Sequence, residues 1–221
     1  VTETVSGCEG PASSIDVVVA TCACTPVSIC PGDAFSYSVT DPDGPNDDKT
    51  TLYILADNAS SAVLSTNATG DFTTYLSTAA AGTYNVHALT YDAGAPPAFL
   101  ANITGGTMTM PADVSGETAC INADFLTDYI CLTLHPAPSL SAVNPAAVCD
   151  GTTVDITTGV VTDANTVATP VITYWTDATA MTSYAGDPAA VAVTSTIYVQ
   201  YASATVPACT DIVQVDVTVN A

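Results

Sequence analysis

The 221-residue chain is 48% hydrophobic but only 10% charged, and its 22 acidic residues face a single basic side chain, Lys49, giving a formal net charge of −21. Phosphate backbones and anionic lipids are bound through Lys and Arg, so this balance excludes nucleic-acid binding and attachment to anionic membranes. The apolar content excludes a disordered chain. No apolar run reaches the length of a spanning helix, so we expect no membrane insertion.

The first segment, residues 1–21, is predicted to be a strand that belongs with a neighbouring module. Residues 4–8 and 15–19 repeat the residue order of 205–209 and 215–219: a Thr-Val pair, a cysteine, then an apolar run with aspartate in second place. The segment therefore resembles the end of a module that the chain does not otherwise contain. We expect it to complete or bridge to a copy or an adjacent repeat.

The first full module is predicted to span residues 22–137 as a β-sandwich. Short apolar runs alternate with turns rich in Gly, Pro and Asn, and no long helical period is present. The predicted strands cover residues 35–39, 51–56, 62–65, 71–76, 83–92 and 129–135. Pro136 and Pro138 then form a stiff, extended connector, because each proline has a fixed φ and no N–H donor.

The second module, residues 138–221, is predicted to be an immunoglobulin-like β-sandwich. Its predicted strands cover residues 154–157, 171–176, 190–193, 196–202 and 212–220. In the last of them, the valines at 213, 215, 217 and 219 share one side, which is the pattern of a half-buried strand. Trp175 lies between Cys149 and Cys209, where a core aromatic packs on a disulfide in immunoglobulin domains. The predicted fold class is thus all-β, with two such sandwiches in tandem.

Eight cysteines without zinc or catalytic spacing indicate disulfides and hence an extracellular or cell-surface location. Cys149-Asp-Gly repeats the pattern of Cys30-Pro-Gly. We expect Cys149–Cys209 to join the first and last parts of the second module. By analogy, Cys30–Cys120 would join those of the first.

Four cysteines then remain near the junction of the N-terminal segment with the first module. Cys131 lies in the last predicted strand of that module and is expected to pair with Cys22 or Cys24. Cys8 corresponds to Cys209, so its counterpart would be the equivalent of Cys149 in a preceding module. The alternative is a bond to the other junction cysteine.

Several motifs, taken in order, resemble the large secreted repeat proteins of Bacteroidota. Residues 82–92 resemble their Gly-Thr-Tyr-x-Val-His-x-Leu-x-Tyr-Asp strand, and residues 119–124 are similar to the cysteine segment that follows it. Residues 173–180 with 197–199 resemble their immunoglobulin-like repeats. The resemblance covers most of residues 26–221. It implies export by a type IX-like system, display as an adhesin or filament, and no catalytic residues.

One acidic cluster could hold calcium. Asp-x-Asp-Gly places two carboxylates across a tight turn, and calcium prefers several carboxylate and carbonyl oxygens in a flexible loop. The candidate ligands are Asp41, Asp43, Asn46, Asp47 and Asp48. The alternative is a solvated turn, because the closing glutamate of an EF-hand loop is missing.

The other candidate sites are three glycosylation tripeptides and two histidines. Asn58, Asn67 and Asn102 each begin an N-glycosylation tripeptide. His87 shares a strand side with Leu89 and is expected to be packed, whereas His135 is expected to be exposed. No nucleophile motif accompanies either histidine, so we expect no enzyme.

The sequence therefore predicts a structural protein: a subunit or repeat of an extracellular filament or cell-surface adhesin. Its partners would be copies of itself or adjacent repeats, held end to end by strand contacts. The alternative is a carbohydrate-binding module of a larger secreted protein that recognises surface glycans.

Overall fold

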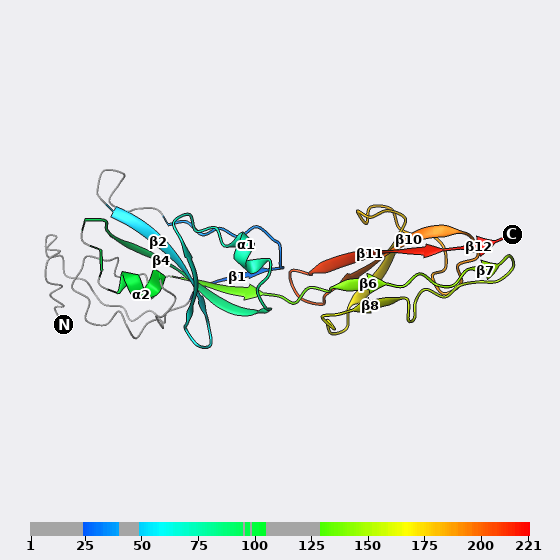
Figure 1. The fold of residues 1–221 in the computed structure, drawn as a ribbon, viewed down its shortest axis with the longest axis horizontal. Coiled ribbons are helices and arrows are strands. Elements are labelled where there is room, and N and C mark those ends of the chain that lie inside the picture. Colours follow the sequence, from blue (N-terminus) through cyan, green and yellow to red (C-terminus); the bar gives the residue numbers. More distant parts are fainter. Residues whose placement is uncertain (1–23, 40–48, 95, 98, 105–128) are drawn as a thin grey trace. The chain divides into compact units, whose positions relative to one another are not determined.

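The computed structural model describes residues 24–39, 49–94, 96–97, 99–104 and 129–221 (Figure 1). The chain divides into two compact units, Val1–Leu134 and His135–Ala221. Strands dominate both units, and the described residues include two short helices, α1 (Thr73–Leu76) and α2 (Leu100–Thr104), in the first unit. The predicted all-β fold class is confirmed. The N-terminal segment, residues 1–21, lies outside the described residues.

The first unit is built on one five-stranded sheet with the order β1-β5-β4-β2-β3. The strands are β1 (Thr25–Ile29), β2 (Lys49–Asp57), β3 (Val63–Asn67), β4 (Gly82–Asp92) and β5 (Ile130–Leu134). All neighbours are antiparallel except β1 and β5, which run parallel with Thr25 opposite Ile130. The edge strand β1 is therefore held beside a strand that lies a hundred residues further along the chain.

This sheet buries apolar side chains on both faces, because successive residues of a strand point to opposite sides. One face packs with α1 in a cluster that includes Tyr53, Leu55, Phe72, Leu76, Tyr84, Val86, Leu132 and Leu134. The other face packs with α2 in a cluster formed by Ile54, Val63, Leu89, Phe99 and Ile103. The two helices thus cover opposite faces of the sheet.

Two predicted strands of the first unit are wrong. Within residues 71–76, Asp71 makes a single bridge and residues 73–76 form α1, whose turn is closed by the N–H of Leu76 donating to the carbonyl of Phe72 at 3.0 Å. Just before it, Asp71 Oδ1 accepts from the N–H of Thr73 at 2.9 Å. Residues 35–39 contribute only a single bridge, between Ser36 and Asp71. The chain is held there by Gly70, whose carbonyl accepts from the N–H of Tyr37 at 3.0 Å.

The second unit contains a three-stranded antiparallel sheet, β11-β10-β9, and two smaller strand pairs. Its strands are β6 (Leu140–Ala142), β7 (Val148–Cys149), β8 (Val161–Asp163), β9 (Val171–Trp175), β10 (Ser195–Ala202), β11 (Thr210–Val217) and β12 (Val219–Asn220). β12 pairs with β7 in parallel, and β6 pairs with β8 in antiparallel. The strands predicted at 154–157 and 190–193 shrink to one bridge between Val154 and Val191.

The core of the second unit confirms the predicted alternation in the last strands. Val215 and Val217 are buried, Val213 and Val219 pack partly against them, and Gln214 is exposed. Segments outside the three-stranded sheet close the core from the opposite side. They contribute Val154, Ile156, Val160 and Val191. Two layers around one apolar core make this unit a small β-sandwich.

Candidate assembly edges and cysteine sites

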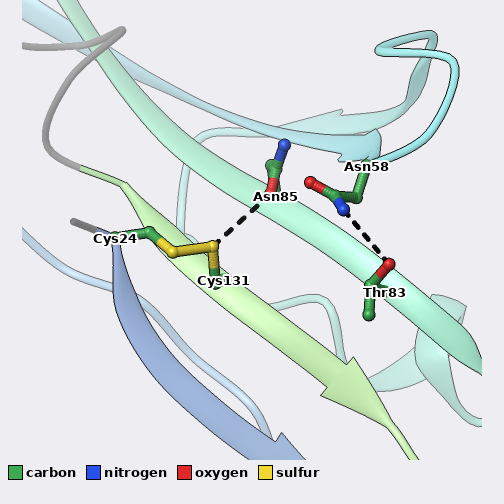
Figure 2. Close-up of a disulfide and its surroundings, with 5 residues drawn as sticks. All are labelled: Cys24, Asn58, Thr83, Asn85 and Cys131. Atoms are coloured by element: carbon green, nitrogen blue, oxygen red, sulfur yellow. Dashed lines mark hydrogen bonds between the residues drawn. A yellow bond between two sulfur atoms is a disulfide. The ribbon is translucent and has the colours of Figure 1, made fainter. Parts of the chain in front are cut away.

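A disulfide joins Cys24, just before β1, to Cys131 in β5 (Figure 2). Their Cα atoms are 5.4 Å apart, within the normal range for a disulfide. Of the two partners left open for Cys131, the structure selects Cys24. The Cys131 sulfur also lies 3.9 Å from Asn85 Oδ1 on β4; this is a contact, since a disulfide sulfur has no proton to donate.

The predicted Cys149–Cys209 disulfide is wrong. Cys149 is an exposed free thiol beside Asn220 in the β7–β12 pair, whereas Cys209 is buried, disulfide-bonded and just precedes β11. The length of β11 and β12 therefore separates the two cysteines, on the order of 30 Å at ~3.3 Å per residue. A disulfide needs Cα atoms within about 7 Å.

The remaining cysteine predictions fall mostly outside the described residues. Cys30 is disulfide-bonded. Its predicted partner Cys120, together with Cys8 and Cys22, lies in the segments that the structure does not describe. The Cys30–Cys120 pairing therefore stays a prediction.

Trp175 does not occupy the core position predicted for it. It lies in β9 opposite Tyr198 of β10, and both side chains are half-buried. Its neighbour Tyr174 packs toward the core, so the alternation of the strand places Trp175 on the outer face. There its indole N–H donates to Thr173 Oγ1 at 2.9 Å.

The predicted calcium ligands Asp41, Asp43, Asn46, Asp47 and Asp48 all lie in residues 40–48, outside the described part of the chain. Within the part that is described, no three His, Cys, Asp or Glu side chains gather closely enough to hold a metal ion.

The described aspartates are instead stabilised by neutral donors. The Thr179 hydroxyl donates to Asp177 Oδ1 at 2.5 Å, and the backbone N–H groups of Thr179, Met181 and Thr182 donate to its carboxylate at 2.8–3.1 Å. These bonds, led by that of the Thr179 hydroxyl, lower the pKa of Asp177 to about 2.

The same arrangement recurs in both units. A side-chain hydroxyl leads the lowering of the pKa at Asp57 (from Ser60), Asp71 (from Thr73), Asp155 (from Thr157) and Asp216 (from Thr196). For three of the five aspartates the signal is Asp-x-Thr, in which the threonine follows two residues later, whereas Asp216 accepts from Thr196 on the neighbouring strand β10. Sequence reasoning missed this pattern, although it explains how a chain with one lysine accommodates so many carboxylates.

The three candidate glycosylation sites differ in their environments. Asn58 is exposed and its amide donates to Thr83 Oγ1 at 3.3 Å (Figure 2). Asn102 is exposed on α2. The amide nitrogen of half-buried Asn67 donates to the carbonyl of Asp71 at 2.9 Å, so a glycan on that nitrogen would disturb the turn. Glycosylation itself stays a prediction.

The two histidines have structural surroundings. His87 is buried in β4 and stacks on Tyr129, with ring centroids 4.8 Å apart. His135 was predicted to be exposed, which is wrong. It is half-buried, and its Nε2 is enclosed with no hydrogen-bond partner among the described residues.

Among the described residues, one edge of the three-stranded sheet in the second unit is covered and part of the other has no backbone partner. On β11, Asn144 Oδ1 accepts from the backbone N–H of Asp216 at 2.9 Å and so covers that edge. On β9, bonds from residues 182–184 reach only Tyr174 and Thr176. Every second residue of a strand directs its N–H and C=O groups to the same edge. The N–H and C=O of Ile172 therefore point to the same edge as those of Tyr174, beyond the part that residues 182–184 cover.

That uncovered part is apolar. Val171 is 58% exposed and Ile172 is 40% exposed. An open edge offers unpaired N–H and C=O groups to another strand, and natural proteins usually protect such edges with charge or proline. Pro170, directly before β9, offers no N–H, but Val171 and Ile172 themselves are neither charged nor proline. This short stretch is therefore the candidate site for strand addition.

Neither helix in the described part of the chain has the length and apolar character needed to cross a bilayer. The Cys24–Cys131 disulfide is a type of bond that persists in oxidising compartments such as the cell exterior.

Comparison with known proteins gives no family. No protein-family model matches the chain, and no curated protein matches it. Among solved structures, EC22–24 of mouse cadherin-23 is 14% identical with a TM-score of 0.26, and EC21–23 of human CDH23 is 11% identical with a TM-score of 0.25. These matches cover 88% and 89% of this chain, and 63% and 72% of the respective cadherin chains.

Proposed function

We propose that the chain is a structural subunit or repeat of an extracellular filament or cell-surface adhesin, and that it assembles end to end through strand contacts. The observation that carries this proposal is the open, apolar start of β9, at Val171 and Ile172. The repetition of residues 205–219 in residues 4–19 supplies a further strand-like segment for contacts between copies.

Strand addition suits the charge of this chain. Ion pairs between copies are hardly available, because each copy brings 22 acidic residues and one Lys or Arg. Main-chain hydrogen bonds need no charge, and apolar side chains beside them supply the remaining affinity. Export through a type IX-like system, as implied by the Bacteroidota motifs, forms part of the proposal.

Electron microscopy and light scattering of the purified chain test this function. We expect regular fibres from the native chain and their loss in Ile172→Lys, because an edge lysine opposes the approach of a second strand. Met181→Lys is the matched control: it adds the same charge to a residue that is 82% exposed beyond the strand, and it should still assemble. Isolated particles from the native chain, or fibres from Ile172→Lys, would contradict the proposal.

A second function, carbohydrate binding, is favoured by the aromatic pair on the outer face of the sheet. Trp175 and Tyr198 lie opposite each other on β9 and β10 and remain partly exposed. Aromatic faces of this kind stack on sugar rings. A glycan array should give specific hits that Trp175→Ala and Tyr198→Ala remove, while Met181→Ala keeps them; an array without hits rejects this alternative.

A further inference from the structure

In the described part of the chain, Cys149 is the cysteine with a free thiol, and it is exposed. It ends β7, which is held in parallel against β12 by bonds from the N–H of Val148 to the carbonyl of Thr218 (3.1 Å) and from the N–H of Asp150 to that of Asn220 (2.8 Å). The thiol is therefore displayed from a fixed backbone rather than from a loose loop.

Cys149 has a structural counterpart in the first unit, Cys30. Each cysteine follows a strand that pairs in parallel with a strand from the end of its unit, β5 or β12. Each opens a tight turn in which its carbonyl accepts a hydrogen bond at 3.1 Å from the residue three places on. Each turn contains a glycine with positive φ, +90° at Gly32 and +82° at Gly151. The two cysteines therefore occupy the same place in two similar local folds.

The counterparts differ in one respect: Cys30 is disulfide-bonded, whereas Cys149 is not. The fold around Cys30 thus shows that a cysteine at this place can take part in a disulfide. The surface near Cys149 also carries an apolar side chain suited to a protein contact. Val193 is 64% exposed, and the next residue, Thr194, exchanges hydrogen bonds of 2.9 and 3.0 Å with Val219 of β12.

We propose that Cys149 forms an intermolecular disulfide with Cys8 in the N-terminal segment of a second copy of this chain. This inference rests on the proposed end-to-end assembly and adds a covalent bond to it.

The choice of Cys8 follows from the repeated sequence. Residues 4–8 repeat 205–209, so Cys8 corresponds to Cys209, which is buried and disulfide-bonded. Cys149 in turn corresponds to Cys30, which is also disulfide-bonded. Cys8 and Cys149 are therefore the counterparts of two cysteines that form disulfides in this fold.

The bond forms by oxidation of two thiols. The Cys149 thiol of one copy and the Cys8 thiol of the other lose two protons and two electrons as the S–S bond forms. An oxidant that carries a disulfide accepts them: oxidised glutathione becomes two glutathione thiols, and a disulfide oxidoreductase becomes a dithiol. The exposure of Cys149 gives such an oxidant access to its sulfur.

The test is to oxidise the purified chain with glutathione disulfide, alkylate the remaining thiols and run denaturing gels without reductant. Digestion after Asp and Glu should then yield a disulfide-linked species that contains peptide 4–9 and peptide 129–150, which carries Cys149 and is also joined to peptide 17–33 by the Cys24–Cys131 disulfide. We expect oligomers that resist detergent and disappear with dithiothreitol. Cys149→Ser and Cys8→Ser should each abolish both these oligomers and the link between peptides 4–9 and 129–150.

A control variant separates a specific bond from random oxidation. Cys149→Ser combined with Thr152→Cys moves the thiol to the exposed end of the same turn, and it should not restore the oligomers. Equal cross-linking by this variant, complete alkylation of Cys149 in fibres, or a Cys8 bond within its own chain would each overturn the inference. Fibres that dissolve in detergent without reductant reject the disulfide but keep the assembly, whereas monomers alone reject both.

Discussion

The disulfide between Cys24 and Cys131 joins the two parallel strands of the first unit, β1 and β5. A parallel pair cannot be closed by a short turn, and here 107 residues separate the two cysteines. β1 is also an edge strand with one neighbour and with Pro26 and Ser28 exposed. The covalent bond therefore fixes the start of an edge strand whose end is anchored by the buried Ile29.

Removal of this disulfide should destabilise the first unit. The double variant Cys24→Ser/Cys131→Ser is expected to lose about 4–5 kcal/mol of unfolding free energy, because the unfolded chain regains the freedom of a long loop. Urea denaturation followed by circular dichroism measures the loss. Cys149→Ser removes an exposed free thiol and serves as the control, with little change expected. Identical unfolding midpoints for the two variants would contradict this role.

Gly70 is a second position where a small change should be costly. Its φ is +73°, and a Cβ built there would lie 1.8 Å from the carbonyl oxygen of Tyr37, a backbone atom that cannot move aside cheaply. We expect Gly70→Ala to lose about 2–3 kcal/mol of unfolding free energy. Gly82→Ala is the control, since nothing lies within 4 Å of its added Cβ. Equal losses for the two variants would show that the close approach is unimportant.

Acid should weaken the aspartate turns. The folded-state pKa of Asp177 is lowered to about 2, so its stabilising effect is present above the unfolded value of about 3.9 and is lost as the pH falls toward 2. The stability difference between the native chain and Asp177→Asn should therefore be constant above about pH 5 and shrink below pH 4. Comparing the two proteins removes the general relief of charge repulsion on acidification, because both share almost the same net charge.

Thr179→Val provides an independent measurement at the same turn. It removes the hydroxyl that contributes most to the lowered pKa of Asp177. Carbon-detected NMR titration should place the pKa of Asp177 higher in this variant than in the native chain. An unchanged titration would show that the backbone N–H groups alone stabilise the carboxylate.

The sequence was sufficient to predict which side chains are buried where a local pattern decides their burial. The alternating valines of β11 and the buried place of His87 follow from a period of two, which depends on neighbouring residues only. The helix at 73–76 was missed because its apolar residues also suit a strand. In the helix, Leu76 packs in the same core cluster as Phe72, a contact between side chains that the strand pattern alone does not reveal.

Long-range pairing could not be predicted in the same way. The Cys149–Cys209 prediction assumed that the first and last parts of the second unit meet at the same end. In the structure, Cys149 meets Asn220, at the far end of β11 and β12 from Cys209. The end of a strand at which a cysteine lies depends on the direction of that strand. β7 runs parallel to β12, and residue composition does not specify this direction.

Salt should promote assembly. Copies with a net charge of −21 repel each other, and the range of that repulsion falls from about 30 Å at 0.01 M ionic strength to about 3 Å at 1 M. Light scattering should therefore show faster association in concentrated sodium chloride, with the native chain and Met181→Lys responding alike. Ile172→Lys should stay unassembled in high salt, because its defect lies at the strand edge rather than in the overall charge. Assembly that weakens with added salt would mean that ion pairs hold the copies together.

Calcium should stabilise the chain more than salt of the same strength does, if the carboxylates at residues 41–48 bind it. An ion that binds only the folded state raises the free energy of unfolding by about 2.7 kcal/mol when its concentration is 100 times Kd, because binding lowers the free energy of the folded state alone. Melting curves with calcium chloride, magnesium chloride and a chelator at matched ionic strength measure this effect. Asp43→Asn with Asp47→Asn should remove the calcium-specific rise in Tm, whereas Asp187→Asn, in an exposed turn of the second unit, should leave it intact. Equal Tm values in calcium and chelator would reject a structural ion and leave this segment as a solvated acidic turn.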